Sequence, residues 1–238
     1  MFSNLRSLIF KLDPEAAHNL AIKSLKFNLV PNILKKNEED NLFTTELFDK
    51  KLENPIGMAA GFDKNAEVYN SLFKLGFGFV EVGTVTPLKQ YGNPKPRVFR
   101  LVEDDALINR LGFNNFGAKD IADRIRSNKQ IGLLGINIGP NKDTKNRLDD
   151  YVECLKSFNG LADYITINIS SPNTKNLREY HDQKKLNELL QTINKEKKTL
   201  IKKTPIAVKV SPDINDQEIT KICEVLVNNN IEAVIVSN

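Results

Sequence analysis

The chain has 238 residues, of which 40% are hydrophobic and 27% charged, so it is long enough to bury the core of one α/β domain. Its formal net charge of +4 is small, and no basic block is interleaved with aromatic residues, which argues against nucleic acid as a partner. No run of about 18 apolar residues and no secretory signal pattern are present, so we expect neither a membrane span nor export. Cys154 and Cys223 lack the spacing of metal ligands and predict reduced thiols packed in helices.

Residues 1–36 form a basic N-terminal segment. Leucines recur at helical spacing between Leu5 and Leu12, and Asp13-Pro14-Glu15 predicts the N-cap and first turn of a second helix. Lysines and arginines outnumber acids around both helices, and short amphipathic helices of this kind are able to lie on an anionic bilayer. The alternative is that both helices simply pack on the domain that follows.

Beyond a polar linker at residues 37–41, two strand-like pieces flank Asp49-Lys50-Lys51 and predict a hairpin. Strands and helices then alternate, a pattern typical of right-handed crossovers and a parallel sheet. The predicted strands are Pro55–Ala59, Phe79–Thr84, Leu133–Ile138, Tyr164–Ser170, Pro205–Val210 and Ala233–Ser237. The predicted helices are Glu67–Leu75, Gly117–Ser127, Asp149–Phe158, Lys184–Lys198 and Asp216–Asn229.

Three of these strands carry polar side chains between apolar ones, so the polar face of each is either half exposed or points into a site. In Tyr164–Ser170 the isoleucines alternate with Thr166, Asn168 and Ser170, so one face is apolar and the other bears amides and hydroxyls. Asn137 and Lys209 interrupt two further apolar strands, and a lysine in such a strand is costly unless an anionic group meets it. The three strands together predict a shared polar pocket and therefore catalysis.

Polar residues at the carboxyl ends of apolar strands favour an α/β fold of the TIM (β/α)8 barrel type. A doubly wound open sheet is the alternative, but no Gly-x-Gly-x-x-Gly follows the first strand. About six of the eight barrel strands are recognisable, and the sequence stops at Ser237-Asn238, inside or just past a strand. We therefore expect residues 42–238 to form an incomplete barrel, truncated at its C-terminus, behind a small two-helix extension.

Four motifs lie at or after the strand ends. They are Met58-Ala-Ala-Gly-Phe-Asp-Lys-Asn65, Gly83-Thr-Val-Thr-Pro87, Asn109-Arg-Leu-Gly-Phe-Asn-Asn115 and Asn168-Ile-Ser-Ser-Pro-Asn-Thr174. Small residues in the first let a planar ligand lie close to the backbone, while the others supply hydroxyls, amides and a guanidinium. Each motif alone is more often a turn than a ligand site. Their occurrence at successive strand ends predicts one binding site.

On these motifs the chain, from Phe10 to Asn238, resembles the dihydroorotate dehydrogenase family of flavin enzymes. Two features are typical of its membrane-associated, quinone-dependent class. Ser171 occupies the position of the catalytic base, where the soluble class typically has cysteine, and a two-helix extension carries Leu-Asp-Pro-Glu-Ala-Ala-His18. The resemblance implies oxidation of (S)-dihydroorotate to orotate in pyrimidine biosynthesis, with FMN as hydride acceptor and a quinone as final acceptor.

The resemblance also assigns roles, and Ser171 is implied to remove the C5 proton of dihydroorotate. Residues implied to bind FMN are Ala60, Gly61, Phe62, Asp63, Lys64, Thr84, Asn137, Asn168, Lys209 and Ser237. Residues implied to bind dihydroorotate are Lys64, Asn109, Arg110, Leu111, Gly112, Phe113, Asn168, Asn173 and Asn238. Lys209 would stabilise negative charge on the flavin, and residues 175–181 would form a lid. A serine hydroxyl is a poor base, so neighbouring groups, a water chain or a dry site must activate it.

The same resemblance gives the N-terminal helices a function, as a hydrophobic path for quinone on which His18 and Arg100 would be polar groups. It implies peripheral attachment to an anionic surface on the cytoplasmic side of the cell membrane. Two alternatives remain: a related FMN oxidoreductase that uses a soluble acceptor such as fumarate, and an inactive fragment that serves as a scaffold or membrane-binding piece. The cradle for the FMN phosphate, on the last two barrel strands of the family, is missing from this sequence.

Overall fold

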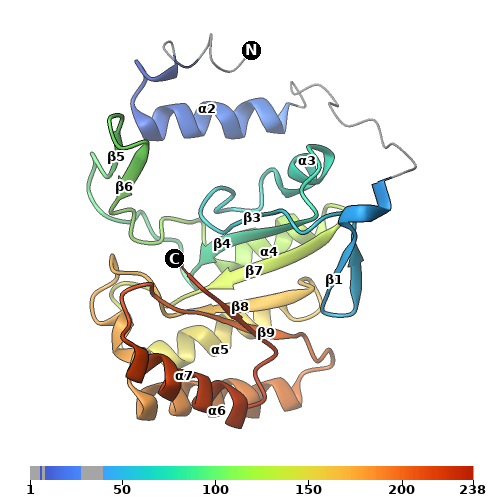
Figure 1. Ribbon diagram of the computed structural model, residues 1–238, viewed down its shortest axis with the longest axis vertical. Coiled ribbons are helices and arrows are strands. Elements are labelled where there is room, and N and C mark those ends of the chain that lie inside the picture. Colours follow the sequence, from blue (N-terminus) through green and yellow to red (C-terminus); the bar gives the residue numbers. More distant parts are fainter. Residues whose placement is uncertain (1–5, 7–8, 28–39, 238) are drawn as a thin grey trace.

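A computed structural model describes residue 6, residues 9–27 and residues 40–237 of the chain (Figure 1). Several predictions fall outside these residues: the leucines at positions 5 and 8, most of the linker at 37–41, and the substrate role of Asn238. No helix in the described part of the chain is long and apolar enough to cross a membrane.

The main domain is a curled parallel sheet covered by helices, and it forms part of a (β/α)8 barrel as predicted. The sheet order is β10-β9-β8-β7-β4-β3, and every neighbouring pair is parallel. Its strands are β3 (Gly57–Met58), β4 (Phe79–Val85), β7 (Leu133–Ile138), β8 (Tyr164–Asn168), β9 (Ile206–Lys209) and β10 (Ala233–Ile235). The crossover helices are α3 (Tyr69–Lys74), α4 (Ala118–Arg126), α5 (Arg147–Phe158), α6 (Gln183–Thr199) and α7 (Asp216–Asn228).

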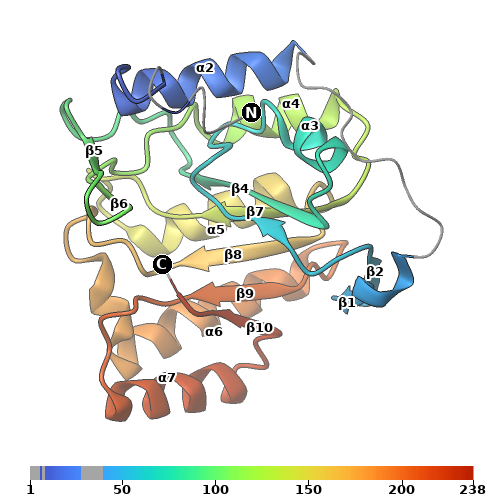
Figure 2. The ribbon, with the colours of Figure 1, turned by 45° about the horizontal axis from the view of Figure 1, so that its top comes forward.

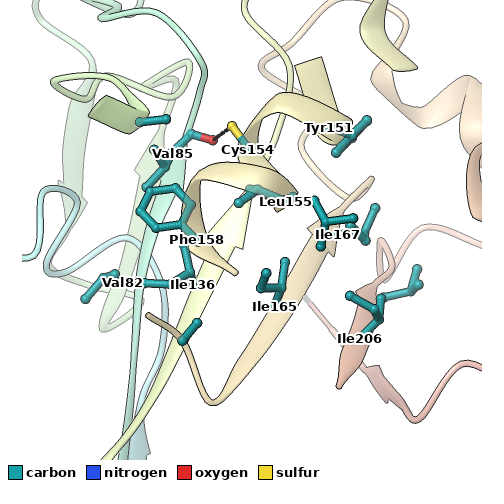
Figure 3. Close-up of a cluster of buried hydrophobic side chains, with 14 of the residues drawn as sticks. Val82, Val85, Ile136, Tyr151, Cys154, Leu155, Phe158, Ile165, Ile167 and Ile206 are labelled. Atoms are coloured by element: carbon teal, nitrogen blue, oxygen red, sulfur yellow. Dashed lines mark hydrogen bonds between the residues drawn. The ribbon is translucent and has the colours of Figure 1, made fainter. Parts of the chain in front are cut away.

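The core lies between the sheet and these helices. Figure 3 shows Phe158 and Leu155 of α5 against isoleucines of β7 and β8, with Cys154 beside the backbone of β4. The predicted alternation of β8 is confirmed, because Ile165 and Ile167 belong to this buried cluster. The other face of each strand is therefore free to carry polar groups toward the centre of the barrel.

Helix α2 (Pro14–Lys26) begins where the sequence predicts it, with the Asp13 carboxylate accepting a hydrogen bond from the backbone N–H of Ala16 at 2.9 Å. It packs against α3 and against strand β5 (Val98–Leu101), which pairs with β6 (Ala106–Asn109). Figures 1 and 2 show α2 and the β5–β6 hairpin side by side over the same end of the molecule.

An ion pair fastens α2 to the main domain. The guanidinium of Arg97, only 6% exposed, donates two hydrogen bonds to the Glu15 carboxylate, at 2.6 and 3.1 Å. Its Nη1 also donates to the carbonyl oxygens of Tyr91 and Asn93, so each of the three guanidinium nitrogens has a hydrogen-bond partner. The hydrogen bonds from Arg97 hold the pKa of Glu15 below its usual value.

Three predictions need correction. The turn of the first hairpin is Phe48-Asp49, where both residues have positive φ, so Lys50 and Lys51 belong to β2 (Lys50–Leu52), which pairs with β1 (Thr45–Leu47). The β5–β6 hairpin is absent from the predicted strands, because the short β6 is fully exposed and shows no period-2 burial. Cys154 is buried as predicted, but Cys223 is exposed on α7.

Candidate active site

The predicted site residues gather because parallel strands deliver their carboxyl ends to one edge of the sheet. β4 brings Thr84, β8 brings Asn168 and β9 brings Lys209 to the same cavity, and the loops after β3, β6 and β8 close around them. The predicted residues that line this cavity are Ala60, Gly61, Lys64, Thr84, Asn109, Leu111, Gly112, Phe113, Asn168, Ser171, Asn173 and Lys209. Gly83, Asn114 and Pro172 also line it and were not assigned roles from the sequence.

A chain of hydrogen bonds crosses the floor of the cavity. The Thr84 hydroxyl donates to Asn137 Oδ1 at 2.6 Å, and Asn168 Nδ2 donates to both of them at 3.0 Å. Asn168 Oδ1 accepts in turn from the backbone N–H and the hydroxyl of Ser170, at 3.0 and 2.8 Å. The amide orientation of Asn168 is thereby set at both ends, and buried amides held in this way are rigid.

Ser171 lies in the turn that follows β8 and is 7% exposed. Its Oγ accepts a hydrogen bond from the backbone N–H of Asn173 at 3.2 Å, and Asn173 Nδ2 donates to the carbonyl oxygen of Asn109 at 3.3 Å. Among the described residues, no His, Asp or Glu hydrogen-bonds to the Ser171 hydroxyl. The Ser171 oxygen is therefore buried and accepts a hydrogen bond, but in the part of the chain that the structure describes no side chain beside it is placed to act as a base toward its hydroxyl.

Two lysines bring positive charge to the cavity. Lys64 Nζ donates to the carbonyl oxygen of Gly61, and burial lowers the pKa of Lys64 while the charge of Glu15 raises it. Burial likewise lowers the pKa of Lys209, and the charge of Glu81 opposes that fall. Both ammonium groups are partly desolvated, so they attract an anionic ligand more strongly than surface lysines do.

Four other predicted residues do not line the cavity. The Asp63 carboxylate accepts backbone N–H groups of Glu67 and Val68, at 2.8 and 2.7 Å, and burial raises its pKa. The Arg110 guanidinium donates to the carbonyl oxygen of Pro96 on the protein exterior. Asn137 lies beneath the lining, and its side-chain amide is hydrogen-bonded to neighbouring side chains, as described above. Ser237 is exposed just beyond β10.

Phe62 and the two residues predicted for a quinone path link α2 to the main domain. The ring of His18 meets Phe62 edge-on, with centroids 5.3 Å apart, next to the loop that carries Lys64. Burial lowers the pKa of His18, and the nearby Lys64 charge lowers it further. Arg100 on β5 donates to the carbonyl oxygen of Leu12 at 2.7 Å. The N-terminal segment therefore contacts the loop that carries Lys64, one of the residues that line the cavity.

One group in this site was missed by the sequence analysis. Glu81 on β4 is 4% exposed and accepts hydrogen bonds from Asn137, Tyr164 and Thr166. An acid between the apolar Val80 and Val82 is the same signal that singled out Lys209, so the sequence carried the information. The helix at Leu177–His181 occupies the segment predicted to be a lid, and it is a short 3-10 helix.

The lining suits a flat, polar-edged cofactor such as a flavin. Gly61 has a φ of +111° and a Cβ added there would meet nothing within 4 Å, so its backbone borders open space. Gly83 has a φ of +120°, and a Cβ there would approach the Asn137 carbonyl oxygen to 2.4 Å. Gly83 thus packs against β7, whereas a ring can lie against the open backbone at Gly61, in the cavity that Asn168 and Lys209 also line. Among the described residues, no group of three or more His, Cys, Asp or Glu is placed to hold a metal ion.

Comparisons with known proteins agree on one family. The family model described as "Dihydroorotate dehydrogenase" matches residues 42–238. A "Dihydroorotate dehydrogenase (quinone)" from Bartonella tribocorum is 49% identical over 237 residues, which cover 98% of this chain and 65% of that protein. One of the same description from Actinobacillus pleuropneumoniae is 44% identical over 246 residues, covering 100% of this chain and 72% of that protein.

Solved structures give the same result. The chain superimposes with a TM-score of 0.87 on a crystal structure of DHODH in complex with ferulenol from Eimeria tenella. The identity there is 36%, over 95% of this chain and 66% of that one. The present chain thus spans about two thirds of the length of the relatives it matches.

Proposed function

Because this chain belongs to the dihydroorotate dehydrogenase family, we propose that its cavity binds FMN and dihydroorotate and supports oxidation of dihydroorotate to orotate with a quinone as final acceptor. One observation supports this reading above others. A buried serine, a rigid amide chain and two partly desolvated lysines from five different segments converge on one cavity beside bare backbone. In that set the serine would meet the acidic C–H group of the substrate, a lysine its carboxylate, and the bare backbone the planar ring of the flavin.

FMN would lie against Ala60, Gly61 and Gly83, with Thr84, Asn168 and Lys209 at its polar edges. When bound, it supplies the acceptor for the hydride that leaves C6 of dihydroorotate. Lys209 adds positive charge at that edge, which favours extra electron density there. Asn137 would hold the amide chain from below.

Dihydroorotate would lie between Lys64 and the loops that carry Asn109 and Asn173. Lys64 attracts the anionic substrate, and the loop at residues 109–113 supplies further hydrogen-bond donors. The hydrogen bond between Asn173 and the Asn109 carbonyl ties the two loops together, so both sides of the substrate are positioned as one unit. Asn238 is assigned to the substrate by family resemblance alone.

Ser171 would take the proton from C5 of the substrate. Its oxygen accepts the N–H of Asn173, and that bond stabilises negative charge that develops on Oγ during the transfer. The proton that the hydroxyl already carries must pass to water, because no acid or base side chain in the described residues contacts it. Access of a water molecule to the buried Ser171 hydroxyl would therefore be part of its activation.

The direct test is anaerobic mixing of the purified flavin-loaded protein with dihydroorotate. We expect the flavin absorbance to bleach, and a short-chain quinone to restore it faster than fumarate does. Stoichiometric FMN that does not bleach would contradict the proposed reaction. Equal reoxidation by fumarate would favour a soluble acceptor in place of quinone.

We also propose that α2 and the β5–β6 hairpin attach the protein peripherally to an anionic membrane surface, from which quinone enters. Large apolar side chains on both elements are exposed: Leu20 is 52% exposed, Leu107 66% and Ile108 55%. Lys11, Lys23 and other basic residues of the same segment suit an anionic surface. His18, which contacts Phe62, and Arg100, which joins Leu12 to β5, would be polar groups along this path.

Sedimentation with vesicles that contain anionic lipid tests this attachment. Replacing Leu20 and Leu107 with serine should reduce vesicle binding several-fold, because each loses apolar area that inserts between lipids. Added salt should weaken binding of the unaltered protein. Serine at Ile201, just after α6, and at Val227 on α7 is the control, because both side chains are even more exposed and these helices lie at the opposite end of the molecule from α2. Equal losses in both double variants would contradict the proposal.

A further inference from the structure

Glu81 is a buried acid at the centre of the half-barrel. It lies in the middle of β4, and its neighbours Val80 and Val82 point the other way, into the helix-covered core. A carboxylate with 4% exposure is costly unless several donors meet it. Its surroundings meet that requirement.

Three hydrogen bonds reach the Glu81 carboxylate. Asn137 Nδ2 donates to Oε1 at 2.8 Å, while the hydroxyls of Tyr164 and Thr166 donate to Oε2 at 2.9 and 2.8 Å. The amide group of Asn137 can only donate at that atom, and burial raises the pKa of Tyr164 well above its usual value, so its hydroxyl keeps its proton. A shell of donors stabilises the ionised carboxylate.

A glycine in the neighbouring strand makes room for the Tyr164 ring of this shell. Gly135 on β7 lies opposite Tyr164, and a Cβ there would lie 2.1 Å from Cζ of the tyrosine ring. The ring therefore lies across Gly135, and only a glycine allows it to reach Glu81 in this way. The close fit indicates a built arrangement around the acid rather than an accidental burial.

Glu81 is connected to the cavity in two ways. Its bond to Asn137 Nδ2 leaves Asn137 Oδ1 to face Thr84 and Asn168, so the acid sets the direction of the hydrogen-bond chain below the cavity. The register of β8 and β9 places Lys209 directly beside Asn168. Among the described residues, Glu81 is the charged group whose field opposes the effect of burial on Lys209.

We propose that Glu81 is a positioning residue of the flavin site, whose ionised carboxylate fixes the orientation of the Asn137 and Asn168 amides and serves as the counter-charge of the Lys209 ammonium. This inference rests on the proposed function for its link to flavin, whereas the charge coupling does not depend on it. Within the described part of the chain, the titratable groups that interact with Glu81 are Tyr164 from β8, through a hydrogen bond, and Lys209 from β9, through its charge, and the neutral Asn137 donates to it from β7.

Glu81→Gln removes the charge and retains the shape. The glutamine oxygen can still accept from Asn137, and both hydroxyls can reverse and accept from its NH2 group, so the fold should persist. Thr166→Val is the matched control, because it removes one hydrogen bond to Glu81 and leaves its charge. Titration of the Lys209 side chain is followed by NMR of protein with ¹³C-labelled lysine, and Lys209→Arg assigns the signal.

We expect Glu81→Gln to lower the titration midpoint of Lys209 by at least about one pH unit, which is a tenfold fall in the ratio of ammonium to amine at a given pH. Thr166→Val should move it much less. An unchanged midpoint in Glu81→Gln, or an equal shift in Thr166→Val, would overturn the counter-charge role. In the unaltered protein, a ¹³C signal of Glu81 that reports a protonated carboxyl at pH 7 would overturn it without any variant.

The flavin-loaded protein provides a separate readout. The alkaline limb of flavin reduction by dihydroorotate should move to lower pH in Glu81→Gln, following the Lys209 midpoint. If the flavin does not bleach at all while the Lys209 midpoint still falls, the proposed reaction is wrong and the role of Glu81 as counter-charge stands. If the midpoint falls but the alkaline limb does not move, the link to the flavin site is wrong.

Discussion

Replacing Ser171 with alanine should slow reduction of bound flavin by dihydroorotate at least ~100-fold, the usual range for loss of a general base. The Ser171 oxygen is buried in the cavity and accepts only the N–H of Asn173, so no neighbouring side chain in the described residues can take over the proton. Rapid mixing under anaerobic conditions measures this step alone. Reoxidation by quinone should change little, because it involves no proton transfer from C5.

Two controls separate chemistry from structure. Ser171→Cys keeps a titratable group whose pKa lies below that of a hydroxyl, so it should retain more flavin reduction than Ser171→Ala. If Ser171 only shapes the turn before Pro172, both variants will instead lower the melting temperature and leave the reduction rate near normal. That outcome would sink its assignment as the base.

Much of the fold was predictable because its signals are local. The isoleucines of β8 alternate with polar residues, so this strand was predicted to within two residues. Asp13 and Pro14 correctly predicted where α2 begins. Parallel strands in a barrel place their carboxyl ends together, which is why Asn168 and Lys209 could be assigned to one pocket before their distance was known.

What was missed depends on contacts between distant segments. The hairpin at 98–109 packs against α2 next to the ion pair of Arg97 and Glu15, and its strand β6 is exposed along its whole length. The Tyr164 ring reaches Glu81 because Gly135, on another strand, leaves room for it. The sequence of β4 alone cannot predict this arrangement. Likewise Asn137 was predicted to contact FMN, yet only the assembled sheet reveals that its amide is already held by neighbours.

Replacing Lys209 with methionine should lower the reduction potential of bound flavin by at least about 30 mV, which is tenfold in the equilibrium constant of a two-electron couple, or abolish FMN binding. The lysine ends β9 half-buried at the cavity floor, where a positive charge acts through few water molecules. Burial lowers its pKa, so the ammonium is present below that value and is lost as pH rises through it. The potential of the unaltered protein should therefore depend on pH in this range, below the usual lysine titration, and that dependence should vanish in the variant.

The Lys209 charge should favour the reduced flavin but oppose folding of the flavin-free protein, and this difference separates its two effects. Because the folded protein holds the pKa of Lys209 below its unfolded value, the buried charge opposes folding at neutral pH, and that penalty disappears once the pH exceeds both values. Lys209→Met removes the penalty, so at pH 7 the free energy of unfolding of the flavin-free variant should be at least as large as that of the original protein. Flavin binding or the flavin reduction potential should nevertheless be impaired. Lys221→Met, on the exposed surface of α7, is the matched control and should change neither quantity. A normal potential with full occupancy in Lys209→Met would mean that the ammonium turns toward solvent and takes no part in the site.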